Sequence, residues 1–201
     1  LKDNKKLMAI AGVLIVQAAV IRLGLVIDTR VVEVLSGATS LSPKYIIPAT
    51  LGAILTAILF DLRISMAVSI FASLYMGLAL GANFLMTLMT MTGGFIAGYV
   101  TKNIRYRFDF VKAVPPIFAI YAVMIFIFTL VNGEAAFSGL LQNWGIASVN
   151  CCAAVFLSMI LTMVFEGLFD VTSNMTLIEL ADMNHPILKR LSIEAAGTYN
   201  H

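Results

Sequence analysis

The sequence predicts an all-α integral membrane protein. We expect a bundle of six spanning helices with both termini cytoplasmic, followed by two short cytoplasmic linker helices. The prediction rests on the composition, the apolar runs and the placement of the basic residues. Hydrophobic residues make up 60% of the 201 residues and charged residues only 12%, with a mean hydropathy of +0.96. An average soluble domain is roughly 45–50% apolar and about 25% charged, so a soluble fold of this sequence could not cover its own surface.

The same composition excludes several other classes of protein. Intrinsic disorder requires low hydrophobicity and high net charge. A formal net charge of +2 is too small to suggest a protein that binds nucleic acid. The two cysteines, Cys151 and Cys152, are adjacent and provide neither a disulfide framework nor the spacing of zinc ligands.

Six apolar runs are long enough to cross a membrane. A hydrocarbon core about 30 Å thick needs a helix of roughly 20 apolar residues, and about 17–25 are tolerated. The runs are residues 7–27, 43–60, 64–81, 84–101, 114–132 and 144–168. They predict a transmembrane helical domain over residues 1–168, with residues 169–201 as a separate cytoplasmic segment.

The basic residues define the expected orientation. If the N-terminus is inside, ten basic residues lie on the cytoplasmic side, and only Arg30 and Lys44 lie in outer loops. This excess agrees with the positive-inside rule, so we expect both termini in the cytoplasm. The ten residues are Lys2, Lys5, Lys6, Arg63, Lys102, Arg105, Arg107, Lys112, Lys189 and Arg190.

One inner loop is the main positive patch, comprising Lys102, Arg105, Arg107 and Lys112. Anionic lipid headgroups attract such residues by about 1 kcal/mol each. We therefore expect this loop to contact the membrane surface. The alternative is a docking surface for a cytoplasmic domain.

Ionisable side chains inside the spans are few. Arg22 lies in the outer third of the first span, and we expect its side chain to extend toward Asp28 or Glu33. The absence of a mid-membrane series of Asp, Glu or His residues argues against proton-driven or ion-coupled transport. Three amides are expected to cap helices or to form hydrogen bonds between them, namely Asn132, Asn143 and Asn150.

Glycines four residues apart predict close helix packing, because a missing side chain lets two backbones approach. The two pairs are Gly77 with Gly81 and Gly94 with Gly98.

The composition changes abruptly after the last span. Thr176 and Glu179 have capping-box spacing and predict a short helix. Pro186 is suited to the first position of a second short helix, with Gly197 as its expected end. Two short amphipathic helices that follow a membrane span suggest an element that couples the bundle to another domain.

This tail resembles the segment between membrane and enzyme in the seven-transmembrane HD-hydrolase family, the PgpH-like membrane-bound cyclic di-AMP phosphodiesterases of bacteria. Ala196 departs from the family, which usually has proline there. The membrane part is similar through residues 2–6, 42–45 and 61–63. The matching tail residues are Leu177, Glu179, Leu180, Asn184, His185, Pro186, Leu188, Leu191, Glu194, Ala195, Gly197, Thr198, Tyr199 and His201.

The resemblance implies an extracellular domain, seven membrane helices and a cytoplasmic metal-dependent HD phosphohydrolase. The chain is then expected to begin after the first of these seven helices. By position, His201 would be the first ligand of a two-metal site for Mn or Fe, and the remaining ligands lie outside this sequence. His185 is expected to cap a helix rather than to bind metal. We thus expect no cofactor and no catalytic residue in this chain alone.

The leading functional hypothesis is the sensor and coupling module of a bacterial hydrolase that acts on cyclic di-AMP. The expected partners are the bilayer of the bacterial inner membrane, the protein's own extracellular and HD domains, and the cyclic dinucleotide as the substrate of the enzyme. A homo-oligomer is left open. The alternative function is a substrate-binding membrane subunit of a small-molecule transporter, and a third interpretation is a structural membrane scaffold. Neither alternative needs the tail.

Overall fold

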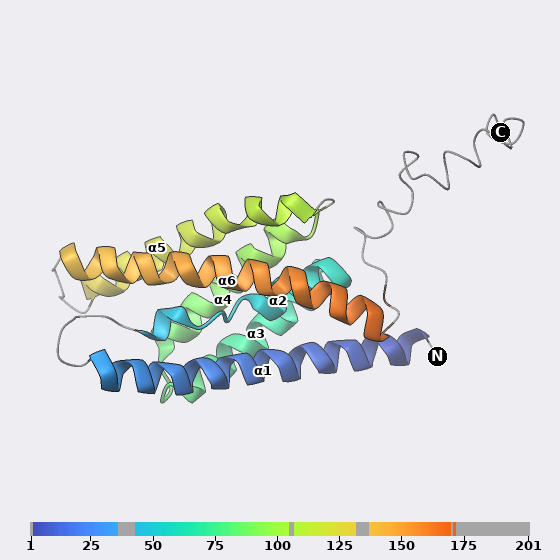
Figure 1. The fold of residues 1–201 in the computed structure, drawn as a ribbon, viewed down its shortest axis with the longest axis horizontal. Coiled ribbons are helices and arrows are strands. Elements are labelled where there is room, and N and C mark those ends of the chain that lie inside the picture. The colour runs from blue at the N-terminus through green and yellow to red at the C-terminus, as the bar shows by residue number, and fades with distance from the viewer. Residues whose placement is uncertain (1, 36–42, 105–106, 132–136, 170, 172–201) are drawn as a thin grey trace, which may run out of the picture.

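The computed structural model describes residues 2–35, 43–104, 107–131, 137–169 and 171. Within these residues the fold is entirely helical and forms an elongated bundle (Figure 1). The α-helices are α1 Lys2–Leu35, α2 Leu51–Leu59, α3 Leu62–Ala79, α4 Phe84–Thr101, α5 Val114–Val131 and α6 Phe137–Phe169. Two 3-10 helices, η1 Pro43–Ile46 and η2 Arg107–Ala113, precede α2 and α5.

Among the described residues, five helical segments are long and apolar enough to cross a bilayer. They lie in α1, α3, α4, α5 and α6, and each overlaps one of the predicted spans. The segments are Asn4–Ile27, Leu62–Ala79, Phe84–Thr101, Phe108–Val131 and Gly139–Phe169. The prediction of an all-helical membrane protein is confirmed at this level.

The predicted span at residues 43–60 does not form a continuous helix. The α-helix covers only Leu51–Leu59, and residues 47–50 between η1 and α2 are not helical. Nine helical residues extend about 14 Å, which is roughly half of the hydrocarbon core. Pro48 explains the break, because it lacks an N–H group and disfavours helical geometry at the residue before it. The expected full-length helix is therefore corrected to a short helix with an irregular lead-in.

Helix α2 lies inside the bundle, where it contacts α1, α3, α4 and α6. All nine of its residues are buried, and so are Ile47, Ala49 and Thr50 before it. Non-helical backbone at membrane depth is tolerated only where protein or water satisfies its polar groups. The backbone N–H and C=O groups at the break before α2 therefore need hydrogen-bond partners from neighbouring side chains.

Tight turns on either side of α3 set the antiparallel course of its neighbours. Asp61 caps α3 through a 2.8 Å bond from the Leu62 N–H to its Oδ1 atom. At the other end, Gly81 has φ +74° and Ala82 φ +62°. Asn83 then caps α4 by accepting the Met86 N–H at 3.1 Å. These caps satisfy backbone groups that a helix end leaves free.

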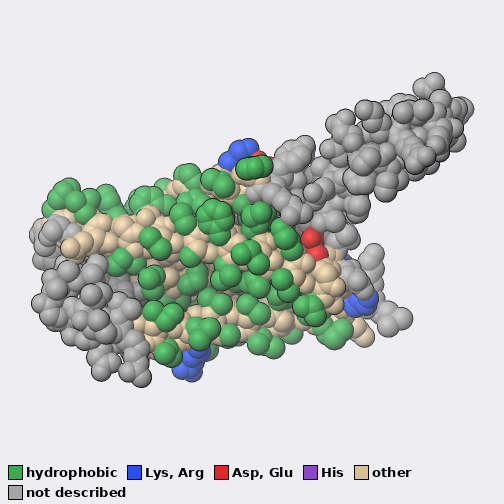
Figure 2. Space-filling view, viewed as in Figure 1, with side chains coloured by type: hydrophobic (Ala, Val, Ile, Leu, Met, Phe, Trp, Pro, Cys, Tyr) green, Lys and Arg blue, Asp and Glu red, His purple; other side chains and the backbone are tan. Residues whose placement is uncertain are grey.

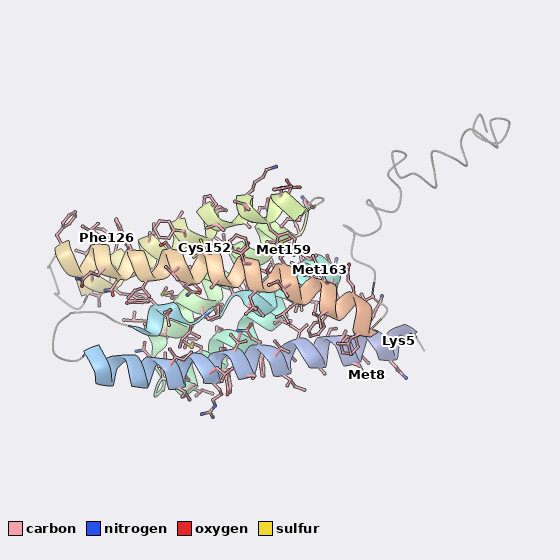
Figure 3. The ribbon with its side chains drawn as sticks, in the orientation of Figure 1. Lys5, Met8, Phe126, Cys152, Met159 and Met163 are labelled. Atoms are coloured by element: carbon pink, nitrogen blue, oxygen red, sulfur yellow. The ribbon has the colours of Figure 1, made fainter. Side chains whose placement is uncertain are left out.

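The flanks of the bundle are apolar, as Figure 2 shows for one face. Met8 of α1, Phe126 of α5 and Met163 of α6 are all exposed there (Figure 3). In a membrane protein such side chains face lipid. Trp144 is the one tryptophan of the chain. It joins α6 to α5 by donating its Nε1–H to the Ala122 carbonyl at 3.1 Å.

Candidate functional site

A polar cluster surrounds the helix break, and Gln17 of α1 is its most buried member, with 0% exposure. Its Nε2 donates to the Ala49 carbonyl at 3.0 Å. Its Oε1 accepts the Gly52 N–H at 2.6 Å. A single amide side chain therefore bridges the break and satisfies one backbone acceptor and one backbone donor. A Cβ at Gly52 would lie 2.9 Å from Oε1, so this close approach requires glycine.

Asn150 of α6 binds the break from another helix. Its Nδ2 donates to the Tyr45 carbonyl at 2.7 Å and to the Ile47 carbonyl at 3.0 Å. The Asn150 side chain is 2% exposed, so these bonds lie away from solvent. An unsatisfied buried carbonyl would cost about 1–3 kcal/mol, and Asn150 prevents that cost at two carbonyls. The expectation that Asn150 caps a helix or bonds between helices is met in the second sense.

Tyr121 of α5 completes the cluster. Its hydroxyl interacts with the side chain of Thr50, the residue just before α2. The Tyr121 ring packs on α4, where a Cβ at Gly93 would lie 3.0 Å from it. The break is therefore held by side chains of α1, α5 and α6. We call Gln17, Thr50, Tyr121 and Asn150 the polar collar.

The four glycines singled out in the sequence occupy two kinds of place. Gly94 and Gly98 of α4 face Ser69 and Ser65 of α3, and a Cβ at Gly94 would lie 2.7 Å from Ser69 Oγ. Gly77 of α3 faces Thr87 of α4 in the same way. Gly81 instead lies in the turn after α3, where its positive φ favours glycine. No atom lies within 4 Å of its Cβ position, so it makes no helix contact there.

Arg22 has a partner on α3 that the sequence did not indicate. Its Nε donates to the Tyr75 hydroxyl of α3 at 2.7 Å. Its guanidinium carbon lies 5.9 Å from the centre of the Tyr75 ring, and the Phe71 ring stacks on Tyr75 at 6.3 Å. The side chains of the expected acids, Asp28 and Glu33, lie outside the described residues. The Arg22 guanidinium thus lies against α3, where it contacts Tyr75 of the stacked pair of Tyr75 and Phe71.

Part of the basic loop is described, and its two lysines have local partners. Lys102 Nζ lies 4.2 Å from the centre of the Tyr99 ring, and Lys112 forms a 2.5 Å ion pair with Asp109. Arg105 and the side chain of Arg107 lie outside the described residues. The loop therefore keeps its aromatic and cationic groups at the end of α4 and the start of α5, where a membrane surface would lie.

The predicted coupling and metal residues of the tail lie outside the described residues. They are Glu179, Asn184, His185, Pro186, Glu194, Gly197, Thr198, Tyr199 and His201. In the part of the chain that the structure describes, no group of three or more His, Cys, Asp or Glu side chains could hold a metal ion.

Sequence reasoning missed Gln17 as a structural centre. Two signals were available: an amide in the middle of an otherwise apolar span, and a proline inside a facing span. Polar residues within membrane spans are expensive unless paired, so each one predicts a partner. The pairing between residues 17 and 49–52 depends on the arrangement of the bundle, which the sequence alone does not define.

The comparison with protein families decides the family. Residues 1–173 match the family described as 7TM receptor with intracellular HD hydrolase. The chain belongs to this 7TM-HD family. The match covers every described helix, including the broken segment and the polar collar. No solved structure matches the chain.

A curated relative carries a more specific name. The chain is 30% identical over 80 residues to cyclic-di-AMP phosphodiesterase PgpH of Listeria monocytogenes serotype 1/2a (strain 10403S). The matched stretch covers 39% of this chain and 11% of that protein. The chain thus corresponds to a small part of the relative, and it is a membrane part of a 7TM-HD protein.

Proposed function

We propose that this chain is the transmembrane sensor and coupling module of a bacterial HD phosphohydrolase that hydrolyses cyclic di-AMP in the inner membrane. The single observation that carries the proposal is the family match over residues 1–173. The choice of cyclic di-AMP is supported by the name of the Listeria relative. The metal-dependent chemistry belongs, in this proposal, to an HD domain beyond the bundle, with His201 as its first ligand.

The proposed topology places both ends of the bundle in the cytoplasm. The broken segment at residues 43–60 would cross the bilayer as the sixth span, in part as extended chain. The start of α1 and the end of α6 lie at the same end of the bundle (Figure 1), which supports this arrangement. The basic residues Lys5 and Lys6 at the start of α1 are exposed at that end. Residues 169–201 would then enter the cytoplasm directly from α6.

The proposed mechanism is mechanical. Input from an extracellular domain or from the membrane would shift helix packing, and residues 169–194 would pass the movement of α6 to the hydrolase. Helix α6 supports this role because it is 33 residues long and continues without a break from the outer end of the bundle to the inner end. A continuous helix transmits a rotation or a shift along its length, whereas a flexible linker does not.

The test uses the full-length protein with its HD domain, reconstituted in lipid nanodiscs with Mn²⁺. The measured quantity is the rate of cyclic di-AMP hydrolysis, compared with that of the excised HD domain. We expect the two rates to differ. Replacement of Asn184, His185 and Pro186 by Gly-Ser-Gly should make the full-length rate equal to that of the excised domain.

A matched control replaces residues 133–135, between α5 and α6 at the other end of the bundle, with the same three residues. This variant should keep the rate of the intact protein. An unchanged rate in the Gly-Ser-Gly tail variant would contradict the coupling role. Hydrolysis of cyclic di-GMP in place of cyclic di-AMP would overturn the substrate, and a gene without an HD domain after His201 would overturn the whole proposal.

A further inference from the structure

The polar collar connects the first and last helices of the chain through the same few backbone groups. Gln17 binds Ala49 and Gly52, and Asn150 binds Tyr45 and Ile47. The four backbone partners lie within eight consecutive residues. Residues 47–50 lie outside regular helix, and the two amide side chains are among the groups that hold this stretch in place. A shift of either helix therefore acts on the same piece of backbone.

The stretch at residues 45–52 packs closely against α1, which limits its freedom to move. A Cβ at Gly24 would lie 2.8 Å from Ile47 Cγ1, so the side chain of Ile47 packs directly on the backbone of α1. Ile47 is 2% exposed, and its carbonyl is one of the two acceptors of Asn150. Residue 47 thus contacts α1 with its side chain and α6 with its backbone. Buried, well-packed groups have little freedom to absorb a displacement locally.

The two helices meet again at the inner end of the bundle. A Cβ at Gly12 of α1 would lie 3.2 Å from the ring of Phe165 and 3.4 Å from that of Phe169, both on α6. The Phe165 and Phe169 rings pack on one another at 5.4 Å. Helices α1 and α6 therefore share a direct contact near the end of α6 and an indirect one through the break. The two contacts lie five residues (about one and a half turns) apart along α1, from Gly12 to Gln17, and 15 residues (about four turns) apart along α6, from Asn150 to Phe165.

We infer that Gln17, the helix break and Asn150 form one mechanical link, through which a shift of α1 is transmitted to α6. The two amides act as one unit and not as two independent caps, because their four backbone partners lie within eight consecutive residues. In the proposed function this link would carry a signal from the helix that follows the family's first span to the helix that leads to the hydrolase. Only the signalling role of the link rests on the proposed function; the mechanical link itself does not.

The test changes Asn150 at one end of the link and measures hydrogen exchange at the Gly52 N–H, the partner of Gln17, at the other end. The Gly52 N–H donates to Gln17, and Asn150 does not touch it. Asn150→Leu keeps the branched shape and the number of heavy atoms of the side chain but removes the amide. In the full chain in detergent micelles, with ¹⁵N-glycine labelling, we expect this change to speed hydrogen exchange at the Gly52 N–H by roughly tenfold, about the effect of losing one buried hydrogen bond. Asn150→Ser makes the same test if the leucine variant does not insert.

Ser158→Ala is the matched control. Ser158 is also buried on α6, but its hydroxyl donates only to Val155 of its own helix. This variant should leave exchange at Gly52 unchanged. The double variant Gln17→Met with Asn150→Leu should lower Tm by less than the sum of the two single variants, because residues coupled through shared backbone are not additive.

Two outcomes would overturn the link: unchanged Gly52 exchange in both Asn150 variants, or additive Tm shifts. The fate of the proposed function is separate. If Gly52 exchange responds but Asn150→Leu leaves cyclic di-AMP hydrolysis by the full-length protein unchanged, the link stands and its use in signalling fails. If the tail experiment supports coupling while Gly52 exchange does not respond, coupling follows another route.

Discussion

Gly94 marks a close approach between α3 and α4. A Cβ at this position would lie 2.8 Å from the Cβ of Ser69. Rotation of the serine cannot relieve that contact, because a Cβ atom is fixed by its own backbone. Any larger residue at position 94 must therefore push the two helices apart. The contact at Gly94 is local, but it sets the distance between α3 and α4 along the rest of their interface.

Gly94→Ala should be less stable than Gly145→Ala by about 1–3 kcal/mol, the usual cost of overpacking a core. Gly145 of α6 is the matched control, because no atom lies within 4 Å of its Cβ position. Both changes gain the same helix propensity, so the difference isolates the contact with Ser69. Thermal unfolding in one detergent measures it. Equal Tm values for the two variants would contradict the close approach.

Asn83→Ala should destabilise the start of α4 by about 1 kcal/mol, the typical cost of losing an N-cap. The reason is the loss of the bond from the Met86 N–H to the Asn83 side chain. Asn103→Ala, at an exposed position after the other end of α4, is the control and should have no effect. Faster amide exchange at Met86 in the Asn83 variant alone would support the cap. Unchanged exchange there would rule it out.

A partner close in the sequence can be deduced from a local pattern, whereas a distant partner cannot. The caps at Asp61 and Asn83 act on residues one and three positions away. The partner of Arg22, by contrast, is 53 positions away, and that of Gln17 is 32–35 positions away. Charge alone suggested an acid for Arg22. The phenol of Tyr75 became its partner because α1 and α3 are neighbours, which no local pattern indicates.

At the scale of elements, α2 shows that a hydropathy window measures apolar side chains and not the continuity of a helix. Residues 43–60 are apolar enough to span, and the window counts apolar side chains without regard to backbone. The backbone instead changes conformation around Pro48. The other five predicted spans lack an interior break of this kind and correspond to continuous helices. A proline in the middle of an apolar run was the available signal, and it predicts a helix end with known physics.

Ala53→Leu should lower stability by about 1–3 kcal/mol through overpacking. Ala53 is 2% exposed, and its carbonyl accepts the Ser65 hydroxyl at 2.7 Å. Ala153→Leu makes the same chemical change at an exposed position of α6 and should shift stability by less than about 0.5 kcal/mol. Denaturation in matched micelles compares the two. A tolerated leucine at position 53 would show that α2 is not enclosed by its neighbours.

At the scale of the whole molecule, the sidedness of the bundle depends on whether the broken segment crosses. The start of α1 lies at the same end of the bundle as η2, which connects the end of α4 to the start of α5 (Figure 1). In a background with Cys151→Ala and Cys152→Ala, we expect Asn4→Cys and Lys112→Cys to react with an impermeant maleimide from one side of the membrane, and Phe137→Cys from the other.

Labelling of Asn4→Cys and Lys112→Cys from opposite sides would mean that residues 43–60 do not cross. Pre-treatment with a permeant thiol reagent, which blocks all three cysteines, is the control for accessibility. The expected pattern follows from four crossings between positions 4 and 112 and one more before position 137. The positive-inside rule then assigns the side with the lysines to the cytoplasm.

The sequence was enough to predict an all-helical membrane protein, because lipid imposes one simple rule on composition and length, and the family followed from the resemblance of the tail. Residues 177–201 carried most of the resemblance, and residues 1–173 confirm the family. The polar collar could not be assembled in the same way. Three of its residues come from α1, α5 and α6, and the fourth, Thr50, lies in the break itself, so their meeting depends on how those helices pack around the break.

Trp144 gives the molecule a built-in optical reporter. Because it is the one indole of the chain and its Nε1–H is bonded to the Ala122 carbonyl, its emission comes from a single known contact between α5 and α6. Any event that separates these helices would release that hydrogen bond and change the wavelength and lifetime of the emission. Movement of α6 relative to α5 can therefore be followed in this chain in real time and without an attached dye.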